Sequence, residues 1–504
     1  MDLVSLQCLL LIALFFITFS IYFFSSLSKE YENKGYKSYP LVGILPDFIK
    51  NRYQILEWVT NILARNPTNT FVFKRLGFYG VTTANPSNIE HILKTNFENY
   101  PKGGRFTYFL EDLLGKGIFN TDAYLWKIQR KTANFEFNTR SIRNFVIKNV
   151  RDEIQLRLIP LLLKNAASKS KETIDLQDLF ERFAFDNVCK VVFNEDPACL
   201  GKDGKSGGEF MSAFEEATML SSGRFFYALP YLWQIKRMLN FGSEKRLKEA
   251  INIVHGFADK IVSARLSSKI ENDENADLLS RFIAKDEYSA EFLRDIIISF
   301  ILAGRDTTSS ALSWFFWILS SRPDVETNIL DELKAIRKSS GKSLDDTYNL
   351  DELREMHYLH ASISEAMRLY PPVAVHSKCC QKDDVMPDGT FVGKGWTVSY
   401  NTYAMGRMEN IWGKDCKEFL PGRWLENGIF QPENMFKYPV FNAGPRMCLG
   451  KDMAYIQMKS IAASVIERFE INVLDTECPE HNLSLTLRMK KGLMVKVRER
   501  YVSM

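Results

Sequence analysis

One ten-residue stretch constrains this chain more than any other, Phe441-Asn442-Ala443-Gly444-Pro445-Arg446-Met447-Cys448-Leu449-Gly450. It places a single cysteine between two glycines, directly before a helix that we expect over residues 453–469. A free thiol is mostly protonated at pH 7, because its ordinary pKa is about 8.5. Backbone N–H groups at the start of a helix favour the thiolate instead. The stretch therefore predicts a reactive or metal-binding thiolate, and its alternative is a structural cysteine buried in a Gly/Pro loop.

A thiolate in this setting suits a haem iron, because its electron donation helps to split a bound O–O bond. Gly444 would permit a turn, and Gly450 would let the backbone pass close to a flat macrocycle. Arg446 is placed to reach a haem propionate, and Phe441 to cover the sulfur side. The pattern Phe-x-x-Gly-x-Arg-x-Cys-x-Gly resembles the haem-binding loop of the cytochrome P-450 superfamily. The resemblance implies that haem b (iron protoporphyrin IX) is the cofactor and that Cys448 is its axial iron ligand.

Composition sets broader limits. The chain has 504 residues, of which 46% are hydrophobic and 25% charged, as in an ordinary globular protein. A formal net charge of +4 without a basic tract gives no reason to expect a nucleic-acid partner. The eight cysteines form no Cys-x-x-Cys pair of the zinc or covalent-haem kind, which indicates a reducing compartment with mostly inert thiols.

The N-terminus predicts a membrane anchor. No charged residue occurs from Leu3 to Ser28, and this run is long enough to span a bilayer. A cleaved signal peptide is the alternative, but Asp2 precedes the run and no Ala-x-Ala follows it. Lysines that follow the run place the bulk of the chain in the cytosol. We expect a single-pass endoplasmic reticulum protein with a signal-anchor transmembrane helix over 1–28, a linker over 29–50 and a catalytic domain over 51–504.

Most of the remaining chain predicts helices. Short strands are expected at Phe71–Phe73 and Val81–Ala84, and two polar tracts, Gly201–Gly208 and Ser267–Asp277, read as surface loops. The expected fold class is mainly α with a small β part, in one compact unit. The resemblance implies a single-domain cytochrome P-450 fold behind the N-terminal transmembrane helix.

One helix of about 30 residues is expected from Ser289, its N-cap, to a stop before Arg322-Pro323. Its middle, Ala303-Gly304-Arg305-Asp306-Thr307-Thr308, contains residues that weaken a helix interior. Gly304 would leave room for a diatomic ligand, Thr307 would donate a hydrogen bond to bound dioxygen, and Asp306 would feed protons from solvent. The alternative is a Ser/Thr-rich patch packed on a neighbouring helix. The segment resembles the oxygen-activating helix of the superfamily, which implies that Asp306 and Thr307 are catalytic.

Three further patterns gain meaning from the resemblance. Trp126 and Arg130 lie four residues apart, on one helix face, and in the family this pair holds a haem propionate; Lys378 is a further candidate for such a contact. A basic stripe beside them would dock the acidic surface of NADPH–cytochrome P-450 reductase, and a solvated face is its alternative. The stripe comprises Lys127, Lys131, Arg140 and Arg143.

Glu365 and Arg368 alone predict only a weak helix ion pair. The resemblance implies that they join Arg423 in a buried charged cluster with a structural role. His357 and His360 have a spacing that could ligate a metal, but we expect a packed or surface pair.

Four motifs occur in the expected order from Trp126 to Gly450, so the resemblance covers nearly the whole chain after the anchor. Tyr358–Ala361, Asp388-Gly389-Thr390 and Met405-Gly406-Arg407-Met408 resemble the plant fatty-acid ω-hydroxylase clan. This implies hydroxylation of the terminal carbon of an aliphatic lipid, with dioxygen and NADPH as co-substrates and further oxidation open. Alternatives are a terminal (C-26 type) sterol side-chain hydroxylase, a jasmonoyl-isoleucine hydroxylase, a hydroperoxide isomerase or dehydratase, and a haem sensor or carrier.

Substrate contacts are expected in the segments that the family uses for recognition. His376 departs from the clan, whose ω-hydroxylases carry Asp at this position. This exchange favours a bulkier or oxygenated substrate, such as a sterol, over a plain fatty acid. Ala303 stands where animal ω-hydroxylases carry a haem-esterifying glutamate, so no such link is expected. The candidate contacts, from Gly103–Thr121, the long helix, Val373–His376 and Leu485–Met489, are Phe106, Phe109, Phe119, Ala303, Val373, His376 and Leu487.

Overall fold

The computed structural model describes residues 14–15, 17–18, 36–39, 42–137, 140–167, 173–201, 207–229, 231–267, 278–284 and 288–500. The predicted anchor over 1–28 lies almost wholly outside this part of the chain. Within it, no helix is both long and apolar enough to cross a bilayer. The chain separates into two compact units, which are Met1–Tyr100 with Ala228–Pro230 and Val375–Cys416 (unit 1), and Pro101–Tyr227 with Tyr231–Ala374 and Lys417–Met504 (unit 2). The predicted boundaries at residues 28 and 50 stay predictions.

Unit 1 is built on a four-stranded sheet with the order β1-β2-β7-β4. Strands β1 (Thr70–Arg75) and β2 (Phe78–Thr83) form a hairpin, β2 runs parallel to β7 (Thr397–Asn401), and β4 (Val375–Cys379) is antiparallel to β7. The hairpin loop has positive φ at both Leu76 (42°) and Gly77 (83°), the geometry of a tight type I′ turn. The remaining elements of unit 1 are α3 (Leu45–Asn51), α4 (Ile55–Arg65), α5 (Pro86–Glu90), α20 (Thr402–Met405), α21 (Glu409–Trp412), β5 (Asp384–Val385) and β6 (Phe391–Val392).

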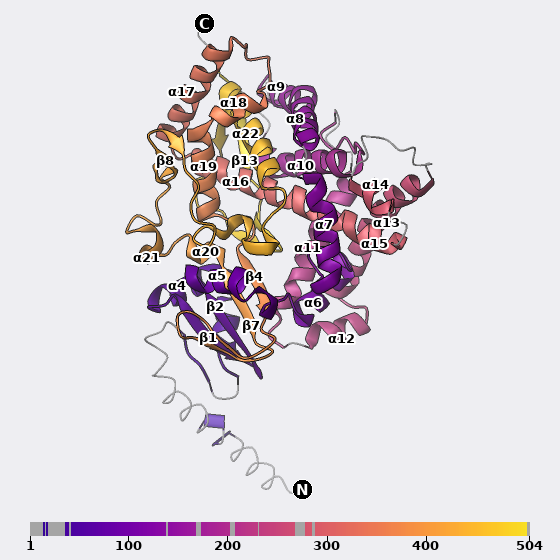
Figure 1. Ribbon diagram of the computed structural model, residues 1–504, viewed down its shortest axis with the longest axis vertical. Coiled ribbons are helices and arrows are strands. Elements are labelled where there is room, and N and C mark those ends of the chain that lie inside the picture. The colour runs from indigo at the N-terminus through magenta and orange to yellow at the C-terminus, as the bar shows by residue number, and fades with distance from the viewer. Residues whose placement is uncertain are drawn as a thin grey trace. The chain divides into compact units, whose positions relative to one another are not determined.

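Unit 2 is mainly helical and holds most of the core. Helix α16 (Thr307–Leu319), nearly all of it buried, contacts α10 (Leu176–Phe193), α19 (His357–Leu369) and α22 (Lys451–Arg468) (Figure 1). The other helices are α6 (Gly104–Leu114), α7 (Ala123–Phe137), α8 (Arg140–Glu153), α9 (Ile159–Ala167), α11 (Gly208–Gly223), α12 (Leu232–Met238), α13 (Ser243–Ser267), α14 (Leu278–Ile283), α15 (Ala290–Ile301), α17 (Pro323–Ser340) and α18 (Leu350–Glu355).

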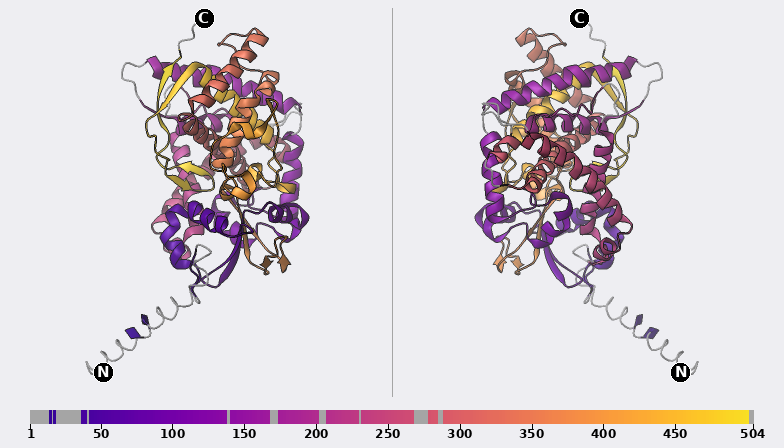
Figure 2. Two further views of the ribbon diagram at one scale, coloured as in Figure 1. Left: turned by 90° about the vertical axis from the view of Figure 1, so that its left-hand side faces the viewer. Right: turned by 90° about the vertical axis from the view of Figure 1, so that its right-hand side faces the viewer.

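Short strands edge unit 2. A three-stranded sheet with the order β10-β13-β3 packs against helix α9, as two further views show (Figure 2). The strands of unit 2 are β3 (Ile174–Asp175), β8 (Leu425–Glu426), β9 (Ile429–Phe430), β10 (Phe469–Val473), β11 (His481–Leu483), β12 (Leu487–Met489) and β13 (Met494–Glu499). A mainly α fold with a small β part is therefore confirmed.

The helix predicted from Ser289 changes type in its middle. Ser289 caps α15 by accepting the N–H of Phe292, as expected, and a π-helical segment, η6 (Leu302–Asp306), then joins α15 to α16. Such π segments occur most often at functional sites. Gly304 in this segment lies so close to α10 that an added Cβ would sit 2.6 Å from Val188 Cγ2. Helix packing alone therefore requires the glycine, and room for a ligand is not needed to explain it.

Gly304→Ala is expected to destabilise the protein by about 1–3 kcal/mol, because the new methyl group overpacks the contact between η6 and α10. Gly256→Ala in α13 is the matched control. Its added Cβ meets no atom within 4 Å, so it should stabilise the protein by about 0.5–1 kcal/mol. Urea unfolding of both variants measures the difference. Val188→Ala should restore stability to Gly304→Ala; equal stability of the two glycine variants would show that the contact is unimportant.

Candidate active site

The backbone around Cys448 is fixed by short-range hydrogen bonds. Gly444 has a φ of 63°, the turn conformation that the sequence predicted. The N–H of Cys448 donates to the carbonyl oxygen of Phe441 at 2.8 Å, and Gly450 is the N-cap of the 18-residue helix α22. The Cys448 side chain is accessible. The chain thus presents one thiol at a helix N-terminus.

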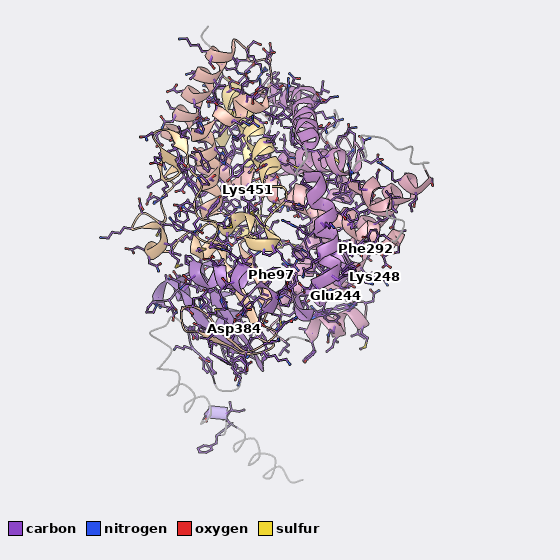
Figure 3. All side chains as sticks on the ribbon, viewed as in Figure 1. Phe97, Glu244, Lys248, Phe292, Asp384 and Lys451 are labelled. Carbon is purple, nitrogen blue, oxygen red and sulfur yellow. The ribbon has the colours of Figure 1, made fainter. Side chains whose placement is uncertain are left out.

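The pKa of the Cys448 thiol is raised, because surrounding protein atoms desolvate it. The N–H of Gly450 and the charges of Arg130 and Lys451 lower that pKa, but burial outweighs them. Lys451 is the first residue of α22 (Figure 3). The predicted thiolate at Cys448 stays a prediction. An iron bound at this sulfur would stabilise the thiolate, since a coordinating thiol is deprotonated outright.

Trp126 and Arg130 both lie beside the cysteine loop, and their shared hold on a haem propionate stays a prediction. The guanidinium of Arg446 lies over the ring of Trp126, 4.4 Å from its centroid, and forms an ion pair with Asp122 at 2.7 Å. Arg130 acts electrostatically on Cys448, and burial lowers its pKa. Within the described residues the Arg130 side chain has no hydrogen-bond or ion-pair partner. A partly desolvated guanidinium beside the thiol fits a cofactor that carries carboxylates.

Lys102 joins this group, and sequence reasoning missed it. Burial lowers its pKa to about 7, the charge of Arg446 lowers it further in the same sense, and Asp122 opposes them. Its Nζ lies 4.3 Å from the ring centroid of Phe106. Lys102, Arg130 and Arg446 outnumber the single acid among them, so these residues fit the two propionates of a haem. The sequence signal that could have identified Lys102 is its place between Pro101 and Gly103, at the start of the expected substrate loop.

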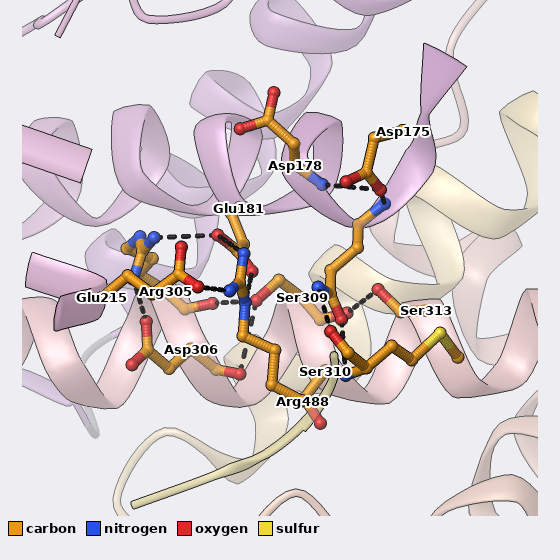
Figure 4. A network of polar contacts seen from close by, with 12 residues as sticks. Asp175, Asp178, Glu181, Glu215, Arg305, Asp306, Ser309, Ser310, Ser313 and Arg488 are labelled. Carbon is orange, nitrogen blue, oxygen red and sulfur yellow. Dashed lines mark hydrogen bonds and ion pairs between the residues drawn. The ribbon is translucent and has the colours of Figure 1, made fainter. Parts of the chain in front are cut away.

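Asp306 is the inner end of a buried series of alternating charges, the charge ladder, which consists of Asp306, Arg305, Glu181, Arg488 and Glu215 (Figure 4). Arg305 bonds Asp306 at 2.5 Å and Glu181 at 2.8 Å. Arg488 bonds Glu181 at 2.5 Å and also pairs with Glu215, whose side chain is 40% exposed. The ladder therefore leads from the π segment to the surface of α11.

The two predicted catalytic residues differ in their surroundings. Burial raises the pKa of Asp306 to about 6, although the charge of Arg305 opposes this. The hydroxyl of Thr307 donates to the carbonyl oxygen of Ala303 at 2.6 Å. The sequence predicted that Thr307 donates to a ligand. To do so, its hydroxyl must first release the hydrogen bond to the Ala303 carbonyl oxygen.

Glu365 accepts hydrogen bonds from two segments, its own helix α19 and residues 420–424. Arg368 binds both carboxylate oxygens, at 2.7 and 2.8 Å, and both side chains are 0% exposed. Arg423 donates at 3.2 Å and Trp424 Nε1 at 2.9 Å, and the N–H of Leu420 donates at 3.0 Å. The structure thus brings together the three residues of the predicted structural cluster.

The predicted substrate residues of unit 2 lie on several different elements. Phe106 and Phe109 belong to α6, which occupies much of the expected loop, and both contact Phe225. Leu487 is 0% exposed, and its carbonyl oxygen accepts the hydroxyl of Ser310 and the indole N–H of Trp314. Leu487 is thus held against α16 through its backbone, and its contact with substrate stays a prediction. Phe119 is exposed, Ala303 lies in η6, and Val373 follows α19.

Lys378 and His376 lie on β4 in unit 1. Lys378 is buried with its Nζ 5.8 Å from the ring centroid of Phe97, which Figure 3 labels. His376 stacks on Tyr400, with centroids 4.5 Å apart. His357 and His360 lie in α19, where His357 Nδ1 accepts the N–H of Phe430 and His360 stacks on the Phe430 ring.

Glu365→Gln is expected to destabilise the protein by about 3–5 kcal/mol, because it leaves the buried charge of Arg368 uncompensated. Asp351→Asn, which breaks the exposed pair with Arg354, is the control and should cost under about 1 kcal/mol. Urea unfolding and cofactor content measure both variants. If both variants lose less than about 1 kcal/mol of unfolding free energy, the cluster has no structural role.

Comparison with known proteins places the chain in a family. A profile of the family described as Cytochrome P450 matches residues 34–497. Cytochrome P450 CYP94D108 of Paris polyphylla is 54% identical over 464 residues, 92% of each chain. Cytochrome P450 94B1 of Arabidopsis thaliana is 47% identical over 474 residues, 92% of this chain and 91% of its own length. Cytochrome P450 86B1 of the same plant is 44% identical over 495 residues, 94% of this chain and 87% of its own length.

These relatives confirm the superfamily that four motifs indicated, and the plant clan within it. The cofactor is therefore haem, and the reaction is an oxygenation that consumes dioxygen and NADPH. The chain belongs to the cytochrome P450 family and is a haem-dependent monooxygenase.

Proposed function

We propose that this cytochrome P450 is a membrane-bound hydroxylase of the terminal carbon of a fatty-acid chain. One observation carries the reaction type. In unit 2, Cys448 lies beside Arg130, which has no partner among the described residues, and the buried acid Asp306 directly precedes Thr307. The haem, when bound, supplies the activation of dioxygen, so that one oxygen atom enters a C–H bond and the other leaves as water, with NADPH as the source of two electrons.

The chain's own residues hold the cofactor and deliver protons. Cys448 would bind the iron, and Arg130, Arg446 and Lys102 would neutralise the propionates. We assign the proton carrier to the Asp306 carboxylate, because a pKa of about 6 lets it exchange a proton near neutral pH. Thr307 Oγ1 would pass the proton on after it releases the Ala303 carbonyl oxygen.

The choice of a fatty acid rests on the clan resemblance and on the surroundings of three residues, Phe106, Phe109 and His376. Phe106 and Phe109 supply apolar surface on α6, as an aliphatic chain requires. The stack on Tyr400 explains the imidazole of His376 without a substrate contact, which weakens the argument for a sterol. An isomerase or dehydratase would have no use for the acid–alcohol pair that η6 and α16 retain.

The membrane proposal rests on the uncharged run Leu3–Ser28 and on one surface of unit 2. Large apolar side chains around α12 are exposed to an extent that is unusual for a water-facing helix, and patches of this kind mark membrane or protein contacts. They are Leu232, Ile235, Met238, Leu239 and Phe241. We propose a single-pass protein of the endoplasmic reticulum membrane with its catalytic part in the cytosol.

Microsomes supplied with reductase and NADPH test the substrate proposal. A fatty acid, jasmonoyl-isoleucine and a side-chain-hydroxylated cholesterol are compared under identical conditions, and a lipid hydroperoxide without dioxygen is the fourth arm. We expect ω-hydroxylated fatty acid as the main product. Turnover of only the conjugate or only the sterol would overturn the substrate, and turnover of the hydroperoxide alone would overturn the reaction type.

Asp306→Asn is expected to lower turnover about 100-fold while haem binding stays intact. The protonated carboxyl is the donor, and its fraction falls as pH rises above about 6. Turnover of the parent enzyme should therefore fall as pH rises through that value, and the variant should lack this dependence. Glu215→Gln, at the exposed end of the charge ladder, is the control and should change turnover less than twofold. If Asp306→Asn keeps the pH profile of the parent enzyme, Asp306 is not the proton donor.

Exposed lysines on α7 are the candidate docking face for the reductase. Lys127 and Lys131 are exposed, whereas the side chains of Arg140 and Arg143 lie outside the described residues. Lys127→Glu with Lys131→Glu should lower reductase-supported turnover at least fivefold and leave peroxide-supported turnover unchanged. Lys245→Glu with Lys248→Glu, on α13, is the control pair. Equal loss in both assays would refute the docking role.

A further inference from the structure

A cavity of about 770 Å³ lies within unit 2 on the side of α22 and α18. Its walls come from α18, α19, α22, η7 (Pro421–Trp424), η8 (Pro439–Phe441) and the segment that follows β9. Cys448, Trp126, Arg130 and Thr307 are not among the residues that line it. The volume lies in the range of small-molecule sites. Phe441, Asn442 and Met447 of the cysteine loop do line it, so the cavity borders that loop without including Cys448 itself.

Six aromatic side chains line the cavity, namely Trp424, Phe430, Phe436, Tyr438, Phe441 and Tyr455. The ring of His360 lies against Phe430 and Tyr455, with centroids 3.8 and 4.0 Å apart. Burial and the charges of Lys459 and Lys451 lower the pKa of His360 to about 2, so the imidazole is neutral. These rings offer flat apolar surface and no negative charge.

Lys459 is the buried charge of the cavity, with a side chain only 6% exposed. Its ammonium carries three N–H donors, and among the described residues its one hydrogen bond goes to the carbonyl oxygen of Leu353. Burial lowers the pKa of Lys459 to about 8, against the charge of Glu332. The carboxylate of Glu332 is itself held by the N–H groups of Tyr358 and Leu359, at 2.7 and 3.0 Å.

The acids on the cavity wall do not supply the missing acceptor. Glu433 pairs with Lys437 at 2.7 Å, and Asp452 is exposed in the first turn of α22. Lys451 adds positive charge to the lining, whereas the charge of Arg354 is paired with Asp351 at 2.8 Å. A buried ammonium with unfilled donors costs free energy until an acceptor reaches it. The electrostatics of the cavity therefore favour an anion.

We propose that this cavity is a second ligand site, which binds a small amphiphilic carboxylate with its carboxylate on Lys459 Nζ and its apolar part against the rings. The inference does not depend on the proposed substrate. A fatty acid and an aromatic acid share this chemistry, and competition distinguishes the two sources.

Photolabelling of the holoenzyme with 4-benzoylbenzoate, followed by peptide mass spectrometry, tests the proposal. Met435 and Met447 line the cavity and are good targets for the excited ketone. We expect label on one of them, at least tenfold more than with 4-benzoylbenzamide, which lacks the charge. Competition by dodecanoate would identify fatty acids as ligands, and competition by 3-phenylpropionate alone would identify aromatic acids. Label that no carboxylate displaces would overturn the proposal.

Lys459→Met keeps the length of the side chain and removes its charge, so it should lower the labelling at least tenfold. Ile456→Phe places a ring in the cavity without changing charge and should also block the label. Lys334→Met, at an exposed position of α17, is the matched control and should label like the parent. Unfolding temperature and haem content show that each variant is folded. Undiminished labelling of both Lys459→Met and Ile456→Phe would contradict the site. Labelling of the parent protein only at residues outside the cavity would also contradict it.

Discussion

The carboxylate of Glu365 is the interaction on which the thiol's position depends. It binds Arg368 within α19 and accepts donors from residues 420–424, so it ties this helix to the segment that leads toward the cysteine loop. The preceding residue, Ser364, extends the connection. The hydroxyl of Tyr438 donates to its carbonyl oxygen at 3.0 Å, and its Oγ bonds the hydroxyl of Tyr455 at 2.9 Å. A fully buried ion pair is costly to desolvate and tolerates no loss of a partner. The Cys448 loop is thereby held from both of its ends.

The same electrostatic principle operates in the helix that carries Asp306. Each charge of the ladder that lies in the core, such as Asp306, Arg305 or Glu181, would be strongly unfavourable without a partner. Arranged with alternating sign, they satisfy one another from Glu215 at the surface to Asp306 in the π segment. The π segment is where Gly304 admits the close approach of α10, which also carries Glu181. Helix packing and the position of the acid are thus set by one local departure from α geometry.

Sequence motifs predicted much of this, and their limits have physical causes. The cysteine loop and the long helix depend on local patterns, which a single sequence displays, whereas the Glu365 cluster was predicted from the family resemblance, because Arg423 comes from a distant segment. The contact of Arg446 with the ring of Trp126 could not be read from a four-residue spacing, because Arg446 comes from a distant segment. Lys102 escaped notice for the same reason, since its lowered pKa arises from burial and from that arginine. The hydrogen bonds from α16 to the Leu487 carbonyl oxygen were equally hidden, because they join segments far apart in the sequence.

The central claim is that a single thiolate, that of Cys448, holds the haem iron. Absorption spectra of the reduced, carbon-monoxide-treated protein test it most directly, with Cys448→Ser as the comparison. A bond from this thiolate predicts a red-shifted Soret band in the parent protein and its loss in the variant. Absence of the band in the parent, or its persistence with serine at position 448, would contradict the account.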